Sequence, residues 1–65
     1  MHLMINGQSQ EVPCTTLTDL LRALQLDAQR LVAEVNGTII ARENFDQTQL
    51  KENDRLELVH FVGGG

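Results

Sequence analysis

The fold is decided by the opening stretch MHLMINGQSQEVPCTTLTDLLRALQL, residues 1–26, which joins a hairpin pattern to a helix pattern. Leu3 and Ile5 alternate with Met4 and run directly into Asn6-Gly7. Alternating apolar residues beside Asn-Gly are a strong short-range signal for a β-hairpin. The chain is therefore predicted to open with two antiparallel strands.

A helix is predicted from Leu17 to about Leu26. Leucines stand at positions 17, 20, 21 and 24, a spacing that places them on one face of a helix. Thr16 followed by Asp19 resembles a capping box, in which each side chain satisfies a backbone N–H at the start of the helix. One face of this helix should be buried and the opposite face should be wet.

A second hairpin is predicted after the helix. Apolar residues alternate over residues 31–35 up to a second Asn-Gly at Asn36-Gly37, and residues 39–41 form a short return strand. Residues 42–49 are predicted to be irregular, with Phe45 as their anchor in the core.

A last strand over residues 55–61 completes the order ββαββ with a late strand. It follows a polar reversal at residues 51–54, where Asn53 suits a left-handed backbone.

A hairpin, a helix and further strands must bury one sheet face against one helix stripe. We predict an α+β domain over residues 1–62, with a mixed sheet of four to five strands on one helix and the first and last strands parallel at its centre. Residues 63–65 are predicted to be a flexible tail.

Composition excludes several classes of function. Sixty-five residues make one small domain, which buries only about 60% of the surface of its unfolded chain. The net charge of −4 and the absence of Trp and Tyr argue against a nucleic-acid partner. No apolar stretch approaches the roughly 20 residues that span a membrane. The single cysteine and the absence of an apolar run in the first ten residues predict a cytoplasmic protein. The nine acidic residues either steer the chain to a basic protein surface or simply keep it soluble.

The sequence does not predict a catalytic or metal site. His2, Cys14 and His60 lack the short paired spacings of metal ligands, and Cys14 is expected to be a small buried apolar residue. The acidic residues are expected to be scattered, without a catalytic triad or a carboxylate pair. We expect the chain to be a substrate of enzymes and not an enzyme itself.

The run of Gly63, Gly64 and Gly65 makes the carboxylate of Gly65 the group of chemical interest. Glycines can enter a channel that is too narrow for a Cβ, although a frayed end or an expression linker would look the same. Gly63 and Gly64 are predicted to form the tail that carries Gly65 into an active site. A carboxylate is a poor electrophile, so acyl chemistry there requires activation, usually as an anhydride with AMP. A sulfur donor could then displace AMP and leave a thiocarboxylate.

The last strand also predicts a docking surface. If Leu56 and Leu58 face the helix, alternation sends Val59 and Phe61 to the other face, next to Val62 and the tail. Exposed apolar residues beside a functional end suit an interface, although scattered exposed apolar residues are common. Val59, Phe61 and Val62 are the partner-binding candidates.

The chain resembles, over its whole length, the ThiS family of sulfur-carrier proteins of thiamine thiazole biosynthesis. The resemblance rests on VNGTIIAR at residues 35–42, LKENDRLELVHFV at residues 50–62 and the final GGG. It implies the ubiquitin-like β-grasp fold, with Gly64 and Gly65 as the family's terminal pair. Asn53, where relatives often have Gly, and Ala41, where they often have Pro, depart from the family pattern.

The resemblance also implies partners. An E1-like adenylyltransferase, ThiF, would use ATP to adenylate Gly65, and sulfur from a cysteine desulfurase would give the thiocarboxylate. Thiazole synthase, ThiG, would then take the sulfur, and the carrier itself would bind no cofactor. Two alternatives remain open. One is a MoaD-like small subunit of molybdopterin synthase, which is typically longer and has a different sequence before its glycines. The other is a ubiquitin-like module whose tail is never activated or is joined to lysines.

Overall fold

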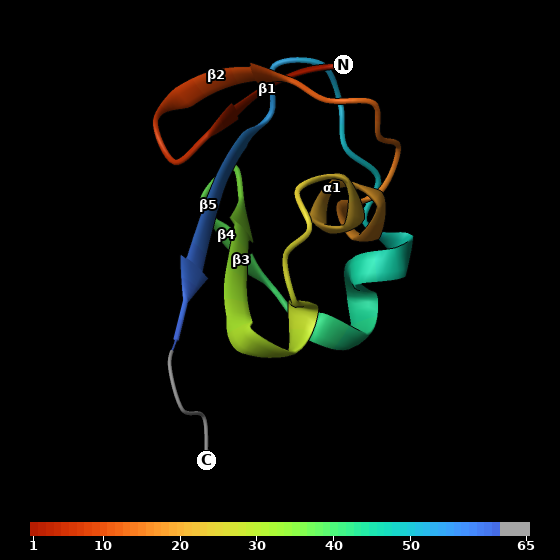
Figure 1. Ribbon diagram of the computed structural model, residues 1–65, viewed down its shortest axis with the longest axis vertical. Helices are drawn as coiled ribbons and strands as arrows, with labels where there is room; N and C mark the ends of the chain where they lie inside the picture. The colour runs from red at the N-terminus through yellow and green to blue at the C-terminus, as the bar shows by residue number, and fades with distance from the viewer. Residues whose placement is uncertain (62–65) are drawn as a thin grey trace.

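The computed structural model describes residues 1–61, and over that range the chain folds as a sheet curled around one α-helix (Figure 1). Four of the residues singled out from the sequence lie outside the described residues, namely Val62, Gly63, Gly64 and Gly65. The predicted flexible tail and the predicted contact at Val62 therefore stay predictions.

Within residues 1–61 the elements follow the order strand, strand, helix, strand, strand, with a late final strand. They are β1 (His2–Ile5), β2 (Gln8–Glu11), α1 (Leu17–Ala23), η1 (Ala28–Arg30), β3 (Leu31–Val35), β4 (Thr38–Ile40), η2 (Arg42–Gln47) and β5 (Arg55–His60).

The described strands form one five-stranded mixed sheet in the order β2-β1-β5-β3-β4. β1 and β5 run parallel at its centre, while β2 and β3–β4 continue it on the two sides through antiparallel pairs. This confirms the predicted element order and the parallel pairing of the first and last strands. β5 ends at the end of the molecule opposite the N-terminus (Figure 1).

Both Asn-Gly turns have a positive φ at each residue, 50° and 80° at Asn6-Gly7 and 50° and 86° at Asn36-Gly37. Positive φ at both central residues matches the right-handed twist of the flanking strands. The asparagine side chains also bind β5. Leu58 donates its N–H to Asn6 Oδ1 at 2.8 Å and accepts from Asn6 Nδ2 at 3.1 Å, and Arg55 donates its N–H to Asn36 Oδ1 at 3.0 Å.

α1 begins as predicted but ends early, at Ala23 instead of about Leu26. Thr16 is the N-cap and forms a full capping box with Asp19. After the cap residue Leu24, Gln25 adopts φ 59°, and Leu26 N–H donates back to the carbonyl of Leu21 at 2.8 Å. This is a Schellman ending, usually built with glycine at the left-handed position.

The prediction that residues 42–49 are irregular is wrong, because residues 42–47 form the 3₁₀-helix η2. A 3₁₀-helix is held by i→i+3 hydrogen bonds, such as the bond from Asn44 N–H to the carbonyl of Ala41 at 2.9 Å. These bonds require no regular spacing of apolar residues, so the polar sequence of this segment does not indicate η2. Phe45 anchors the segment with only 4% of its surface exposed, as predicted. η2 packs against α1, where Thr18 donates its hydroxyl to Asp46.

The core lies between the concave face of the sheet, α1 and η2. Its buried side chains are Leu3, Ile5, Val12, Leu17, Leu20, Leu21, Leu31, Ala33, Phe45, Leu50, Leu56 and Leu58. All of them precede Val59. In the part of the chain that the structure describes, no buried side-chain polar atom lacks a hydrogen-bond partner, and no helix is long and apolar enough to cross a membrane.

Candidate functional site

β5 provides a firmly held base for the end of the chain. β1 pairs with it on one side and β3 on the other, and the side chains of Asn6 and Asn36 add hydrogen bonds to its backbone. Phe61, the first residue after β5, donates its N–H to the carbonyl of Arg30 at 3.0 Å. The backbone is therefore hydrogen-bonded up to Phe61, two residues before Gly63 and four before Gly65.

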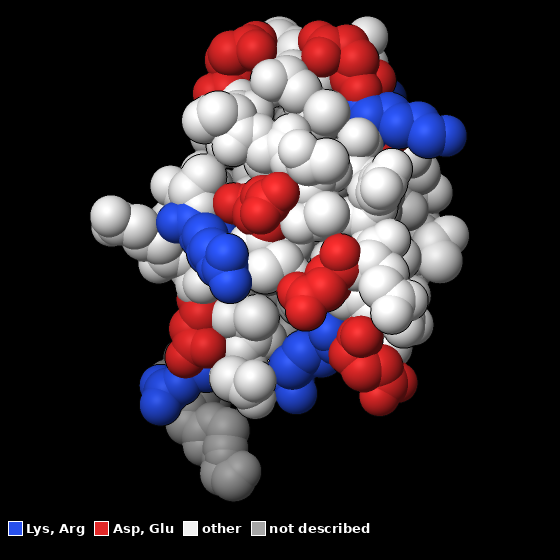
Figure 2. All heavy atoms as spheres, turned by 90° about the vertical axis from the view of Figure 1, so that its right-hand side faces the viewer, with Lys and Arg blue, Asp and Glu red and all other residues white. Residues whose placement is uncertain are grey.

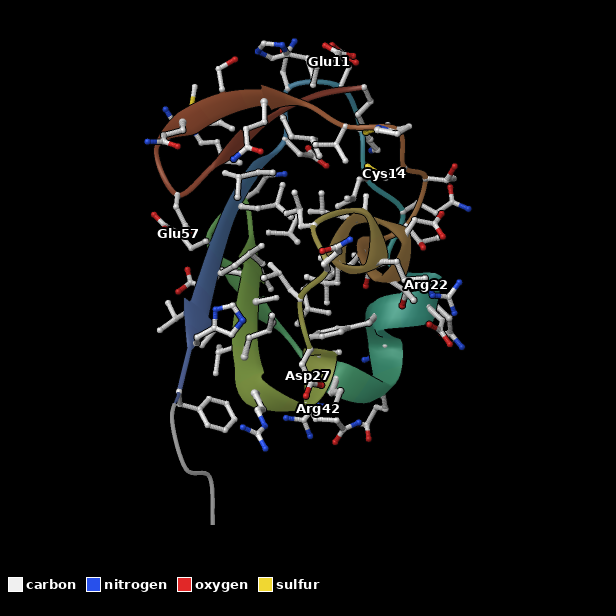
Figure 3. The ribbon with its side chains drawn as sticks, viewed as in Figure 1. Glu11, Cys14, Arg22, Asp27, Arg42 and Glu57 are labelled. Carbon is white, nitrogen blue, oxygen red and sulfur yellow. The ribbon has the colours of Figure 1, made fainter. Side chains whose placement is uncertain are left out.

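Side chains along β5 alternate as predicted from Arg55 to Val59, but His60, at the next inward position, is exposed. Leu56 and Leu58 are buried, whereas 57% of Val59 is exposed. Figure 3 shows Glu57 on the side of the sheet away from α1. Phe61 is 40% exposed. Val59 and Phe61 are thus accessible to a partner, and their role in partner binding remains a prediction.

The register of β3 and β5 brings together residues of the outer sheet face that lie far apart in sequence. Val32 stands directly opposite Val59, and Glu34 directly opposite Glu57. Ile39 of β4 lies opposite Glu34 on its other side. Glu34 and Glu57 are therefore neighbours in the sheet although they lie far apart in sequence. Only the long-range register of two strands creates the Glu34–Glu57 pair, and a local pattern carries no sign of it.

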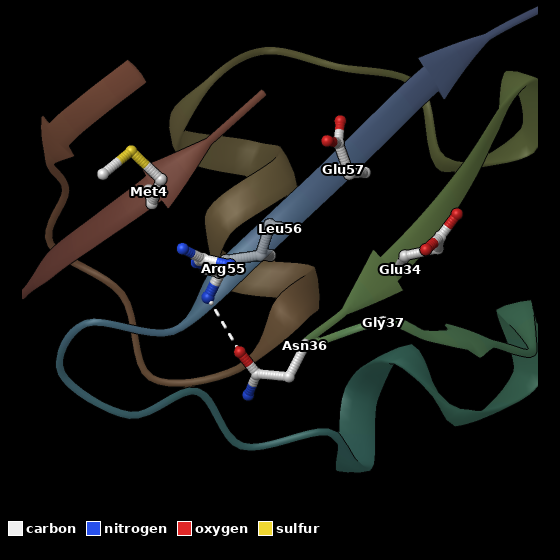
Figure 4. Close-up of a pocket in the computed structure, with 7 residues that line it drawn as sticks. All are labelled: Met4, Glu34, Asn36, Gly37, Arg55, Leu56 and Glu57. Carbon is white, nitrogen blue, oxygen red and sulfur yellow. Dashed lines mark hydrogen bonds between the residues drawn. The ribbon is translucent and has the colours of Figure 1, made fainter. Parts of the chain in front are cut away.

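A hollow of about 570 Å³ adjoins the two glutamates on this face (Figure 4). It is lined by Met4, Glu34, Asn36, Gly37, Arg55, Leu56 and Glu57. Figure 4 shows the Arg55 guanidinium toward Met4, at the other end of the hollow from the two carboxylates. The hollow is therefore acidic at one end and basic at the other.

The sequence also carries no sign of a cluster of three polar side chains, Ser9, His2 and Glu11. The β1–β2 register sets His2 opposite Glu11 and Met4 opposite Ser9, so His2 Nε2 meets Ser9 Oγ while His2 Nδ1 lies 3.6 Å from Glu11 Oε1. A serine, histidine and glutamate in this order resemble a catalytic triad. The Glu11 side chain is 73% exposed, however, whereas the acid of a triad orients its histidine from a buried position. We assign the three residues a structural role, because their side-chain contacts join β1 to β2.

The thiol and imidazole groups do not gather into a reactive centre. Burial raises the pKa of the Cys14 thiol, so the thiol is a weak nucleophile at neutral pH. His60 pairs with Leu31 in the sheet, and His2 pairs with Glu11 on the opposite side of the sheet. Over residues 1–61 no three His, Cys, Asp or Glu side chains gather closely enough to hold a metal ion.

One α-helix packs against a mixed sheet in which β1 and β5 run parallel at the centre. This arrangement is the ubiquitin-like β-grasp fold. The model of the ThiS family matches residues 3–65, and the chain belongs to this family. It is similar to the crystal structure of the thiamine biosynthesis protein ThiS from Geobacter metallireducens, with a TM-score of 0.85 and 38% identity over 100% of both chains.

Two kinds of sequence relative also match. The sulfur carrier protein ThiS of Bacillus subtilis (strain 168) is 42% identical over 50 residues, which are 77% of this chain and 76% of that protein. A thiazole synthase of Magnetococcus marinus is 33% identical over 66 residues. That match covers 100% of this chain but only 20% of the synthase, so the whole chain corresponds to about a fifth of a longer protein.

Proposed function

We propose that this chain is the sulfur carrier of thiamine thiazole biosynthesis and that its sulfur is carried on the carboxylate of Gly65. The observation that carries the proposal is the match to the ThiS family, which runs through Gly63, Gly64 and Gly65. The similarity to a protein named as a sulfur carrier supports the same role.

The chemistry starts from the carboxylate of Gly65. One of its oxygens attacks the α-phosphorus of ATP and displaces pyrophosphate, which gives an acyl-adenylate. Hydrosulfide derived from a cysteine desulfurase then attacks the acyl carbon and displaces AMP, which leaves the thiocarboxylate. Where the donor is a persulfide, the first product is an acyl disulfide, and a thiol must reduce its S–S bond to release the thiocarboxylate. An E1-like adenylyltransferase catalyses the activation, so ATP belongs to that enzyme and the carrier is its substrate.

Thiazole synthase is the proposed acceptor of the sulfur. Two proteins of that name, from Magnetococcus marinus and Paramagnetospirillum magneticum, each contain a segment similar to this whole chain that makes up 20% of their length. Joining a carrier-like segment to a synthase in one chain supports a direct partnership between the two. After the transfer the carrier regains its carboxylate.

The chain's own contribution is to present the tail. β5 is hydrogen-bonded on both sides, and Val59 and Phe61 are exposed near its end. We assign Val59, Phe61 and Val62 to contact with the enzymes that act on Gly65. Such apolar contacts would hold the domain while the glycines 63–65 enter the active site.

The experiment that tests the proposal is the intact mass of the protein after incubation with ATP, the host's E1-like enzyme and a sulfur source. We expect one oxygen to be replaced by sulfur, and fragmentation to map the change to Gly65. A variant that lacks Gly65 should gain neither AMP nor sulfur and should melt at the same temperature. A wild-type protein that stays unmodified by an enzyme active on another carrier, or a truncated protein that is still adenylated, would refute the assignment.

A further inference from the structure

We propose that Asn36 deamidates spontaneously and that the carboxylate produced at this position weakens the attachment of β3 to β5. Deamidation is easiest where glycine follows asparagine, because glycine has no Cβ to hinder attack by its own backbone nitrogen. The chain has two such sites, Asn6-Gly7 and Asn36-Gly37, both in two-residue hairpin turns. The hydrogen-bond partners of the two amides differ, and this difference selects Asn36.

The reaction replaces the side-chain amide by a carboxylate. The nitrogen of Gly37 loses its proton to base and attacks Cγ of Asn36, and the side-chain nitrogen takes up a proton and leaves as ammonia. Water then opens the cyclic imide to give aspartate or isoaspartate. Apart from its chain neighbours, no atom of residues 1–61 lies within 4 Å of the place where a Cβ on Gly37 would stand. None of the turn and loop hydrogen bonds found in that range uses the Gly37 N–H, so this nitrogen is accessible to base.

Attack on Cγ requires the Asn36 side chain to leave its hydrogen bonds and approach the Gly37 nitrogen. Asn36 Oδ1 accepts from the backbone N–H of Arg55 at 3.0 Å (Figure 4), and Asn36 Nδ2 donates to Asp54 Oδ1 at 3.0 Å. Both bonds are exposed. Water can therefore replace the two partners, and little free energy is needed to open the bonds.

Asn6 is held more firmly. Its side chain bonds to both backbone groups of Leu58, at 2.8 and 3.1 Å, and these bonds are partly buried. Opening them leaves partly buried backbone groups without partners, which costs more than opening exposed bonds. Asn36 should therefore react before Asn6, although glycine follows both.

The carboxylate formed at position 36 meets a second carboxylate. One of its oxygens takes the place of Nδ2, which lies 3.0 Å from Asp54 Oδ1, and two negative charges so close together repel each other. Asp54 is held in place, because its Oδ2 accepts from the N–H of Lys51 at 2.8 Å and its carbonyl accepts from the N–H of Met4 at 2.9 Å. The repulsion therefore acts on the start of β5. Isoaspartate also adds a carbon to the backbone of the turn between β3 and β4.

The position of the new charge determines its effect. On the helix side of the molecule acidic and basic side chains are interspersed (Figure 2), so an added acid there finds cations nearby. The exposed Gln29 also lies near cations, since it precedes Arg30 and its carbonyl accepts from the Arg42 guanidinium at 3.3 Å. At position 36 the added acid instead faces Asp54.

The first test incubates the wild type at mildly alkaline pH and follows each site by peptide mass mapping. In the folded protein, acid should accumulate at position 36 several times faster than at position 6. In denaturant the two sites should react at similar rates, because a β-branched residue, Ile5 or Val35, precedes each asparagine and glycine follows it. A folded protein that does not react at Asn36, or that reacts as fast at Asn6, would overturn the assignment.

The second test measures the effect of the product on the melting temperature. Asn36→Asp should lower it by roughly 4–8 °C, as when a contact worth one hydrogen bond is lost from a domain of this size, and added salt should reduce the loss. Combining Asn36→Asp with Asp54→Asn should restore it, because the two side chains then exchange the roles of donor and acceptor. Gln29→Glu, with the same added charge, should melt like the wild type.

The outcomes of the second test are also decisive. If Asn36→Asp melts like the wild type, or if Asp54→Asn does not restore its melting temperature, the carboxylate does not act through Asp54 and the proposed weakening is wrong. An equal loss in Gln29→Glu would assign the effect to net charge instead of position. Neither test uses the enzyme that activates Gly65, so the outcomes are independent of the proposed function.

Discussion

Asn6 and Asn36 hold equivalent positions in two hairpins, and the side chain of each binds the same strand. The parallel register of β1 and β5 covers only two residue pairs and ends at Ile5–Leu56. Beyond it, the Asn6 amide accepts from the N–H of Leu58 and donates to its carbonyl. The Asn6 side chain thus forms the two hydrogen bonds that a backbone peptide of β1 would form. It extends the pairing of β1 with β5 beyond Ile5, where the chain turns into the hairpin.

We therefore predict that Asn6→Gly destabilises the protein by about 1–3 kcal/mol, the cost of leaving two backbone groups without partners. Glycine keeps the positive φ of this position, so the change isolates the loss of the amide. Denaturant unfolding gives the free energy directly.

Asn53→Gly is the matched control. Asn53 also has a positive φ, of 71°, but its bond to the carbonyl of His2 uses the backbone N–H, which glycine retains. Its stability should change little. Equal losses at the two positions would show that backbone freedom, and not the Asn6 amide, sets the cost.

At the scale of elements, the start of α1 depends on a charge. Asp19 accepts from the N–H groups of Thr15 and Thr16, both at 3.2 Å, and returns its own N–H to Thr16 Oγ1 at 3.1 Å. The hydrogen bonds from the Thr16 and Thr15 backbone hold the pKa of Asp19 below its ordinary value. The folded state therefore favours the ionised form.

A pH-dependent difference follows for Asp19→Asn. Because folding lowers the pKa of Asp19, its charge adds stability above the ordinary pKa of the group, and this stability is lost as the pH falls through the folded value. The wild type should be more stable than the variant at neutral pH, and the difference should shrink as the pH falls through the folded pKa of Asp19. Thermal unfolding across this range measures it.

Thr16→Ala provides the contrast. It removes the hydroxyl cap and should cost about 1 kcal/mol. This cost should change less with pH than the Asp19→Asn difference, because the Thr16 side chain lowers the pKa of Asp19 less than the backbone N–H groups of Thr16 and Thr15 do. If the two variants depend equally on pH, the contribution of Asp19 is geometric and not electrostatic.

Local elements of this fold could be predicted and longer-range features could not. Asn-Gly turns and the capping box are specified by residues within a few positions of one another, and both were found from the sequence. The end of α1 was missed because Gln25 takes the left-handed position that glycine usually marks. The Glu34–Glu57 pair was missed because it depends on which strands become neighbours.

At the scale of the whole molecule, the residues that hold the fold are largely separate from those that face a partner. The twelve buried core residues found within residues 1–61 lie at or before Leu58, whereas Val59 and Phe61 are exposed. Truncation of the tail should therefore leave the fold intact, and changes on the outer sheet face should alter recognition more than stability.

The two phenylalanines of the chain test this separation directly. Phe45 is 4% exposed and Phe61 is 40% exposed. Phe45→Ala should cost about 3–5 kcal/mol through the cavity that it leaves, a large share of the roughly 3–10 kcal/mol expected for a domain of this size. Phe61→Ala should cost under about 1 kcal/mol, since surface changes usually have small effects.

Adenylation should respond in the opposite order. With folded protein in excess, Phe61→Ala should lower kcat/KM for adenylation by about tenfold, as expected when an aromatic anchor is lost from an interface. The folded fraction of Phe45→Ala should be adenylated normally, because Phe45 packs inside the core. Melting curves and initial rates on the same samples compare the two effects. If Phe61→Ala melts as low as Phe45→Ala and is adenylated at the wild-type rate, Phe61 belongs to the core and the docking role assigned to it is wrong.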